Sequence, residues 1–273
     1  HRGAVTALAF TPRDGRLAST GDDGTVRFWY LEGAVECEVR GEGDTGHAGG
    51  ATAFAFLPSP KDDAADGSDL ALGIGSLGTF AHHTVVHEAS CIKIEKEIPL
   101  DKACLLGCGV VTGWGSAVYA AQVQPGDTVA VVGCGGIGSN AIQGAKLAGA
   151  RVVAAIDPVE FKREKAMEFG ATHTHASIDD ALAALPDTTW NRGFDKVIMT
   201  CGVGNGDVLG QAFWLGGKRS KIVVTNIHST TEASIAIPAV FLTVFEKQLI
   251  GSLFGSANPR KDIPKLLELY TQG

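Results

Sequence analysis

Three glycines and one aspartate have a spacing that is typical of nucleotide-binding sites. In "TVAVVGCGGIGSNAIQGAKLAGA", Gly133, Gly135 and Gly138 form a G-x-G-x-x-G motif between a β-branched apolar run and an amphipathic, helix-forming segment. Asp157 ends the next apolar run, about 20 residues beyond Gly138. The motif alone is weak, but strand, glycines, helix and carboxylate in this order predict a dinucleotide-binding site.

Each residue of this pattern has its own physical task. Gly133 permits a tight turn, Gly135 lets a pyrophosphate approach the backbone, and Gly138 allows the helix to pack closely on the strand. The amides at the start of the helix then bind the phosphates. Asp157 accepts hydrogen bonds from both ribose hydroxyls and repels a 2′-phosphate, which favours NAD over NADP. Asp157 also suits the N-cap position before Pro158, and the two roles can coexist.

Cys108, in "CLLGCGVVTGWGSAV", is a second candidate for chemistry, as a zinc ligand. Zinc needs three or four protein ligands, so Cys108 requires partners. His82, His83 and His87 lie upstream, and on a strand His83 and His87 would share one face while His82 points to the other. With Cys108 they would complete a tetrahedral set. The alternative, which we favour, is that they are solvated polar residues on a strand.

Cysteine usage and charge limit the compartment and the partners. The six cysteines contain no C-x-x-C pair, which indicates reduced thiols in a cytoplasmic setting rather than a disulfide framework. With a net charge of −7 and no Lys/Arg cluster, we expect no nucleic-acid partner. Apolar runs such as "TVAVVG" are far shorter than the ~18 residues of a membrane span, so we expect no membrane partner. Apart from Cys108, we expect buried thiols at Cys37, Cys91, Cys104, Cys134 and Cys201.

The elements that must position the nucleotide motif form a repeating pattern. Short Val/Ile-rich runs alternate with amphipathic segments such as "PVEFKREKAMEFG". This alternation predicts an α/β fold with a doubly wound, parallel Rossmann sheet. The six predicted strands lie in "DTVAVVG", "RVVAAID", "ATHTHA", "DKVIMTC", "SKIVVTN" and "QLIGSLFG".

The start of the chain follows a different pattern. "HRGAVTALAFTP" (1–12) and "HAGGATAFAFLP" (47–58) match at most positions, and "RLASTGDDGTVRFWYLEG" predicts two strands around an Asp-Asp-Gly turn. Residues 1–58 resemble one WD-repeat propeller blade and the opening strand of a second, with Tyr30 in place of the usual Asp. Fewer than about three repeats bury no continuous core, so we expect marginal stability. The polar stretch "SPKDDAADGS" (59–68) predicts a linker.

Residues from about 69 to 273 resemble the zinc-dependent medium-chain alcohol dehydrogenases, in particular their nicotinoprotein branch, which is assayed with nitrosodimethylaniline. The resemblance rests on "GTFAHHTVVHEASCIKIEKEIPLDKACLLGCGVVTGWGSAV", "VQPGDTVAVVGCGGIG", "DPVEFKREKAMEFGATH" and "GSLFGSANPRKDIPKLL". It implies that 69–110 is a strand-and-loop remnant of the catalytic domain and 111–273 the NAD-binding domain. By matching position it implies a catalytic-zinc ligand at Cys108, a nicotinamide neighbour at Thr112, a pyrophosphate turn of Gly133, Gly135, Gly136, Ile137 and Gly138, and adenosine-ribose contacts at Asp157 and Lys162.

Two departures from the family bear on activity. The family's other catalytic-zinc ligands, a Cys and a His-Glu pair, and its four-cysteine structural zinc lobe have no counterpart in this sequence. Zinc is therefore expected for the family, but its site is incomplete here. Asn226 stands where relatives carry Gly beside the nicotinamide, so its side chain either crowds the ring or is absorbed by the loop.

These observations leave two leading hypotheses. The first is the NAD-binding part of a zinc-type alcohol dehydrogenase, acting on a small alcohol or aldehyde and inactive alone. The second is a non-catalytic chimera that binds NAD(H) and uses the WD-repeat segment to bind a protein partner. A zinc-independent reductase is a third, against which Cys108 counts. The first residue is His, so we expect a fragment or processed piece, and the resemblance implies homo-oligomers through the Rossmann edge strand near "QLIGSLFG".

Overall fold

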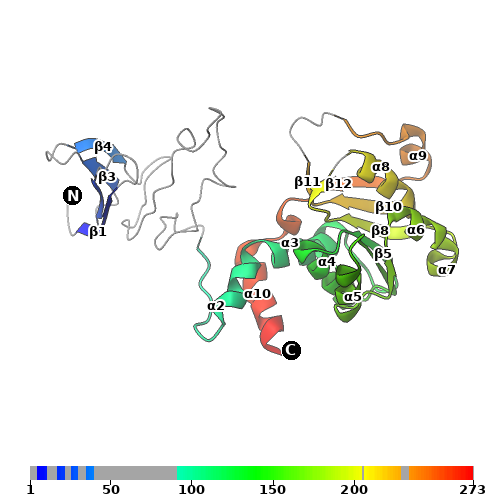
Figure 1. Ribbon diagram of the computed structural model, residues 1–273, viewed down its shortest axis with the longest axis horizontal. Coiled ribbons are helices and arrows are strands. Elements are labelled where there is room, and N and C mark those ends of the chain that lie inside the picture. The colour runs from blue at the N-terminus through cyan, green and yellow to red at the C-terminus, as the bar shows by residue number, and fades with distance from the viewer. Residues whose placement is uncertain are drawn as a thin grey trace. The chain divides into compact units, whose positions relative to one another are not determined.

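The computed structural model describes the backbone of four strands between residues 5 and 39, and then residues 91–204, 206–228 and 234–272. The chain divides into two compact units, His1–Lys93 and Ile94–Gly273, which are described separately (Figure 1). The second predicted repeat (47–58), the linker (59–68) and the three histidines of 82–87 lie outside the described residues.

The described part of the first unit is a four-stranded antiparallel sheet in the order β1-β2-β3-β4. Its strands are β1 (Val5–Phe10), β2 (Leu17–Gly21), β3 (Val26–Trp29) and β4 (Val35–Val39). Phe10 pairs with Leu17, and Leu17 pairs in turn with Trp29, where the sequence places the end of the strand. That this sheet is a propeller blade stays a prediction.

A six-stranded parallel sheet forms the centre of the second unit, as the sequence predicts. Its order is β12-β10-β8-β5-β6-β7. The first strand therefore lies in the middle, and the chain continues to one side of it and then to the other. The strands are β5 (Thr128–Val132), β6 (Val152–Ile156), β7 (His173–His175), β8 (Phe194–Met199), β10 (Gly216–Val224) and β12 (Gln248–Gly251). This order places a topological switch point between β5 and β8, where doubly wound sheets bind ligands.

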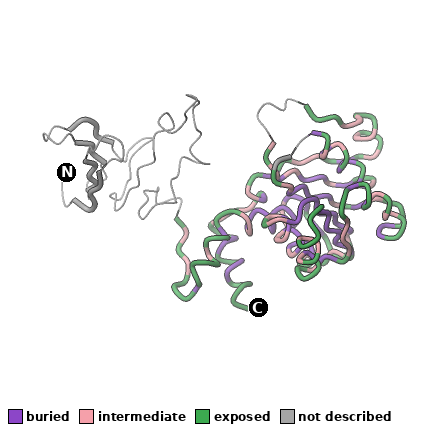
Figure 2. The backbone as a smooth tube through the Cα atoms, viewed as in Figure 1, coloured by how far each residue is buried: buried purple, intermediate pink, exposed green. Residues whose placement is uncertain are grey.

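Helices cover both faces of this sheet. Alternate residues of β5 face opposite sides, so Val129 and Val131 belong to one apolar cluster and Ala130 and Val132 to the other. All five residues of β5 are buried, as the core of Figure 2 shows. The first cluster includes residues of η4 (Ser116–Ala120), α4 (Gly136–Leu147) and α5 (Glu160–Glu168). The second includes residues of α6 (Ile178–Ala183), α7 (Leu185–Thr189), α8 (Gly206–Leu215) and α9 (Ala239–Val244).

The segment that carries Cys108 is helical and packs by close backbone contact. It comprises α2 (Leu100–Ala103), η3 (Cys104–Gly107) and α3 (Gly109–Gly115), which continues into η4. A methyl group at Gly113 would lie 2.1 Å from the carbonyl oxygen of Ile137 on α4. One at Gly115 would lie 2.5 Å from the carbonyl oxygen of Gly255, in η5 (Phe254–Ser256), which precedes α10 (Pro259–Gln272). Gly113 and Gly115 therefore serve packing, whereas a methyl group on Gly107 or Gly109 would meet open space.

Among the described residues, no single helix is long and apolar enough to cross a membrane. The bent pair 100–107 and 109–120 reaches that length and composition only when taken together.

Candidate nucleotide-binding site

The glycine turn after β5 is held in shape by the strand beside it. Gly133 has a φ of +94°, and a methyl group there would lie 2.6 Å from the backbone nitrogen of Cys201, which follows β8. The Thr200 hydroxyl donates a 2.6 Å hydrogen bond to the carbonyl oxygen of Gly133. A methyl group at Gly138 would lie 1.8 Å from that same oxygen. The structure therefore supports the tight-turn and close-packing roles predicted for Gly133 and Gly138.

The two glycines between them face open space. Apart from the chain neighbours and the backbone of the same helix, no heavy atom of the described residues lies within 4 Å of a methyl group built on Gly135 or Gly136. The φ of Gly135 is −74°, which any residue adopts. The turn continues through Ile137 into α4, whose first amides have no partner within the helix. This space beside a helix N-terminus fits a pyrophosphate, so the residues present are compatible with a dinucleotide.

Asp157 lies directly after β6 and closes the other side of the turn. Its side chain is 6% exposed. Oδ2 accepts a 2.8 Å hydrogen bond from the backbone amide of Cys134, inside the glycine turn. Oδ1 accepts a 2.9 Å bond from the amide of Val159. The carboxylate thereby fixes the turn and keeps further lone pairs. The Lys162 ammonium lies 3.7 Å from Oδ2, and its side chain is 43% exposed.

The N-cap role predicted for Asp157 is wrong. Helix α5 begins at Glu160, with Val159 at the N-cap position and no side-chain cap. The carboxylate instead closes a local turn onto the amide two residues ahead. Arg163, which the sequence did not indicate, donates a 2.8 Å hydrogen bond to the carbonyl oxygen of Asp157. The backbone at this strand end is thus fixed from the helix that follows it.

Thr112 reaches the same edge of the sheet through a chain of hydrogen bonds. Thr112 is buried on α3, and its carbonyl oxygen accepts a 2.7 Å bond from the Ser116 hydroxyl. The Ser116 and Thr225 hydroxyls are 2.8 Å apart and buried. Thr225 follows β10 directly, and its amide bonds to the carbonyl oxygen of Met199, at the end of β8. Sequence reasoning missed Ser116 and Thr225, because nothing local links residues so far apart in the chain.

Asn226 is next to this chain of hydrogen bonds. Its Nδ2 donates to the Cys201 sulfur at 3.4 Å. Its Oδ1 is buried and has no hydrogen-bond partner among the described residues. The loop therefore accommodates the amide nitrogen of Asn226 but, among the described residues, supplies no donor to its oxygen.

Cys108 belongs to no cluster of metal ligands among the described residues. It is exposed and stands at the N-cap position of α3. Within the described parts of the chain, no three His, Cys, Asp or Glu side chains come together as a metal site. One thiolate does not provide the three or four ligands that zinc needs. The residues described here therefore do not fit a zinc centre.

The remaining thiols differ from one another more than we predicted. Burial, with a smaller contribution from the Asp157 charge, raises the pKa of Cys134 to about 12. Burial also raises the pKa of Cys201, which is half-buried. The prediction of buried thiols is wrong for Cys91 and Cys104, which are exposed. The side chain of Cys37 lies outside the described residues.

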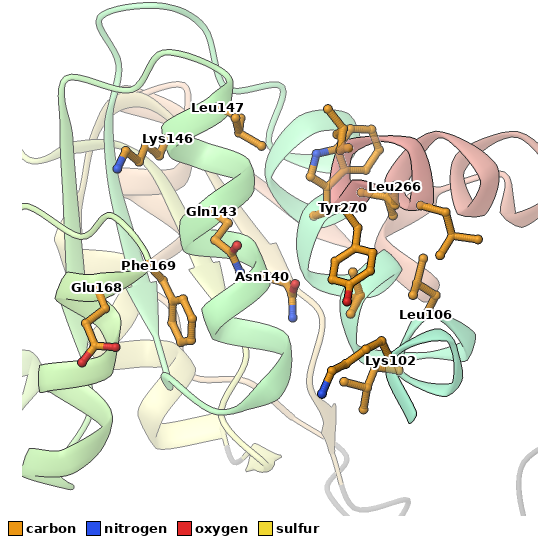
Figure 3. Close-up of a pocket in the computed structure, with 15 residues that line it drawn as sticks. Lys102, Leu106, Asn140, Gln143, Lys146, Leu147, Glu168, Phe169, Leu266 and Tyr270 are labelled. Carbon is orange, nitrogen blue, oxygen red and sulfur yellow. The ribbon is translucent and has the colours of Figure 1, made fainter. Parts of the chain in front are cut away.

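A cavity of about 710 Å³ lies away from the glycine turn, between helices rather than at the strand ends. Figure 3 shows it bordered by α4 and α10, with Leu106, Leu147 and Leu266 among its apolar lining. Lys102 and Lys146 stand at the same cavity. Its lining contains none of the residues that the sequence assigns to the nucleotide, so this cavity and the predicted site are separate places.

The strand order, the glycine turn and the carboxylate after the second strand define a Rossmann-type nucleotide-binding domain. The zinc-binding dehydrogenase family model matches residues 136–272, half of the chain, and the WD domain, G-beta repeat model matches residues 1–30. The chain therefore belongs to the zinc-binding dehydrogenase family, which confirms the resemblance seen in the sequence.

Known relatives and structures agree with this assignment. An NDMA-dependent alcohol dehydrogenase of Amycolatopsis methanolica is 46% identical over 197 residues, which cover 72% of this chain and 53% of that protein. Alcohol dehydrogenase B of Mycobacterium tuberculosis H37Rv is 45% identical over 197 residues, covering 72% and 52%. The crystal structure of benzyl alcohol dehydrogenase from Acinetobacter calcoaceticus superposes with a TM-score of 0.67 at 30% identity, covering 72% of this chain and 54% of that one. The chain spans about half the length of the curated relatives that it matches.

Proposed function

We propose that this chain binds NAD(H) along the carboxyl edge of its six-stranded sheet, as the cofactor-binding half of a zinc-type alcohol dehydrogenase. The open space at Gly135 and Gly136 carries the proposal. Neither the backbone conformation of Gly135 nor contact with the described residues requires glycine there. Glycine at this position therefore serves a group outside the chain, and the pyrophosphate of a dinucleotide suits it.

The chain's own residues would divide the work of holding the cofactor. The first amides of α4 bind the phosphates, and Asp157 with Lys162 binds the adenosine ribose. Thr112, fixed through Ser116, packs beside the nicotinamide. When bound, NAD supplies the ring that accepts or donates hydride, with a small alcohol or aldehyde as its partner. Among the described residues, the family resemblance assigns only Cys108 to zinc. One ligand does not hold a catalytic zinc, so we expect this chain to bind NAD(H) without turning over alcohol.

Calorimetric titration of the full chain with NADH tests cofactor binding. We expect wild type to bind and Gly135→Ala to bind at least about tenfold more weakly, because its methyl group enters the space proposed for the pyrophosphate. Gly107→Ala is the matched control, since it also adds a methyl group to open space, but in η3. Equal affinities in all three proteins would contradict the proposed pyrophosphate position, and no binding to wild type would overturn the proposed function.

The choice between cofactors depends on Asp157. Its buried carboxylate would face a 2′-phosphate with charge repulsion, so we expect NADPH to bind more weakly than NADH. Asp157→Asn removes the charge and should narrow this difference. Equal affinities of wild type for NADH and NADPH would contradict the role of Asp157.

Catalytic activity is a separate question. A zinc-supplemented assay that shows alcohol turnover by this chain would overturn the expected inactivity.

A second role is favoured by the first unit. Residues 1–30 match the WD-repeat model and belong to a separate compact unit, so we propose that this unit binds a protein partner. Strand β12 is an edge of the parallel sheet, and we propose that a second copy pairs there. Light scattering of the full chain tests the oligomer, and a strictly monomeric mass would contradict it. Retention of a partner that requires residues 1–58 supports the binding role, and retention by the second unit alone would contradict it.

A further inference from the structure

Asn226 lies on the opposite side of β5 from Asp157, the residue that we propose binds the adenosine ribose. Asp157 follows β6, on one side of β5, whereas Asn226 follows β10, on the other side. A dinucleotide bound across the switch point places one nucleotide over each half of the sheet. Because neighbouring strands are about 4.8 Å apart, β10 lies two strand spacings, about 10 Å, from β5. The half opposite Asp157 therefore receives the second base.

The surroundings of Asn226 leave its oxygen as the unused group. The amide nitrogen of the side chain donates to the Cys201 sulfur at 3.4 Å, which is a weak acceptor. The backbone nitrogen of Asn226 bonds at 3.3 Å to the carbonyl oxygen of Met199 and ties the residue to the end of β8. Oδ1 has no partner in the part of the chain that the structure describes. A buried acceptor without a donor is costly, so a donor from outside the chain would stabilise this arrangement.

Nicotinamide carries such a donor. Its carboxamide NH₂ has two hydrogens, and a side-chain amide oxygen is a good acceptor for either. Asn226 as a whole is partly exposed, and among the described residues its carboxamide makes one hydrogen bond, the weak one to the Cys201 sulfur. Rotation about the Cβ–Cγ bond would break this one weak bond and would exchange the positions of Oδ1 and Nδ2, so that Oδ1 could face a bound ligand.

We propose that Asn226 is a cofactor-binding residue whose Oδ1 accepts a hydrogen bond from the nicotinamide carboxamide and orients the ring. The proposal rests on the proposed binding of NAD(H). It gives the side chain at this position a role in binding, besides the two alternatives that the sequence left open, crowding of the ring and accommodation by the loop.

Three ligands separate this role from general cofactor binding. NAD carries the carboxamide, 3-acetylpyridine adenine dinucleotide carries a methyl group in place of its NH₂, and ADP-ribose lacks the ring. Calorimetry with the full chain should show wild type binding NAD roughly two- to tenfold more tightly than the acetyl analogue. Asn226→Ala should abolish this preference, while its affinity for ADP-ribose should equal that of wild type.

Two further variants make the test specific. Asn226→Asp keeps an acceptor and loses the amide donor, so it should retain the preference for NAD over the acetyl analogue. Gln211→Ala, which removes an exposed carboxamide from α8, should behave as wild type.

Each contrary result has a definite meaning. Tighter binding of NAD by Asn226→Ala would show that the side chain crowds the ring, and would overturn the proposal. Equal weakening of NAD and the acetyl analogue, or loss of the preference in Asn226→Asp, would also overturn it. Failure of wild type to bind ADP-ribose would overturn the proposed function, and the role of Asn226 with it. Binding of ADP-ribose without any preference for NAD would leave the proposed function standing and reject Asn226 alone.

Discussion

Two glycine-rich segments of the second unit, the nucleotide turn at 133–138 and the helical segment at 104–118, differ in how their chemistry is built. In the turn, two strand ends supply the groups that hold the backbone in place: the Thr200 hydroxyl bonds to Gly133, and the Asp157 carboxylate bonds to Cys134. In the helical segment, Cys108 is an exposed thiol without a set of partners among the described residues. The turn draws on nearby backbone and two strand ends, whereas a metal site needs several side chains brought together from separate segments.

Thiol chemistry should show the largest difference between the two segments. Cys134 in the turn is buried with a pKa raised to about 12, so at pH 8 only about one molecule in 10⁴ carries the reactive thiolate. Cys108 is exposed. A short pulse of iodoacetamide at pH 8, read by mass spectrometry of peptides, should label Cys108 and leave Cys134 unmodified. Labelling of both at similar rates would show that the turn opens readily.

Within the turn, substitution of a glycine that packs against backbone should lower the free energy of unfolding far more than substitution of a glycine that faces open space. Gly138→Ala places a methyl group 1.8 Å from a backbone oxygen, so we expect the free energy of unfolding to fall by about 3 kcal/mol or more. Gly135→Ala should change it by no more than about 0.5 kcal/mol. Urea denaturation measures both, and a similar loss in the two variants would remove the distinction.

In the helical segment, substitution of a packed glycine should also lower the free energy of unfolding, though by less. Gly115→Ala brings a methyl group within 2.5 Å of the Gly255 carbonyl oxygen, and η5 has to shift to admit it. We expect a loss of about 1–3 kcal/mol in the free energy of unfolding. Gly109→Ala, where the methyl group meets no described atom, is the matched control and should lie within about 0.5 kcal/mol of wild type. An unaffected Gly115→Ala would contradict the packing role.

The smallest effect is expected at Cys108 itself. Because the thiol is exposed and isolated among the described residues, Cys108→Ser should leave the free energy of unfolding within about 0.5 kcal/mol of wild type. Adding one equivalent of zinc should shift the melting temperature equally in the two proteins. A zinc-dependent rise in wild type that Cys108→Ser abolishes would reveal a metal site that includes this thiol.

The parts of this fold that depend on local pattern were predictable. Each of the six predicted runs contains a strand of the sheet. A strand buried on both faces needs a continuous apolar run, as in β5 and β6, whereas the edge strands β7 and β12 are only partly buried. The spacing of Gly133 and Gly138 predicts the turn, because the positive φ of Gly133 and its contact with Gly138 lie within the motif, whereas the contacts with Thr200 and Cys201 come from a distant strand end.

Features that depend on distant contacts or on a choice between local bonds were not predictable. The Ser116–Thr225 bond joins residues 109 positions apart, and no periodicity indicates it. Asp157 could satisfy an N-cap pattern or turn back onto the glycine loop, and only the fold decides between them. The exposure of Cys91 and Cys104 depends on what packs over them, which composition does not contain.

The bond from Thr200 to Gly133 also bears on how fast a cofactor can associate. It closes the turn using groups of the protein alone, so the backbone that we propose to bind phosphate is in place before any ligand arrives. A preorganised site loses little conformational entropy on binding. Association should then proceed in a single kinetic phase whose rate rises linearly with nucleotide concentration, without the plateau that a slow loop closure imposes.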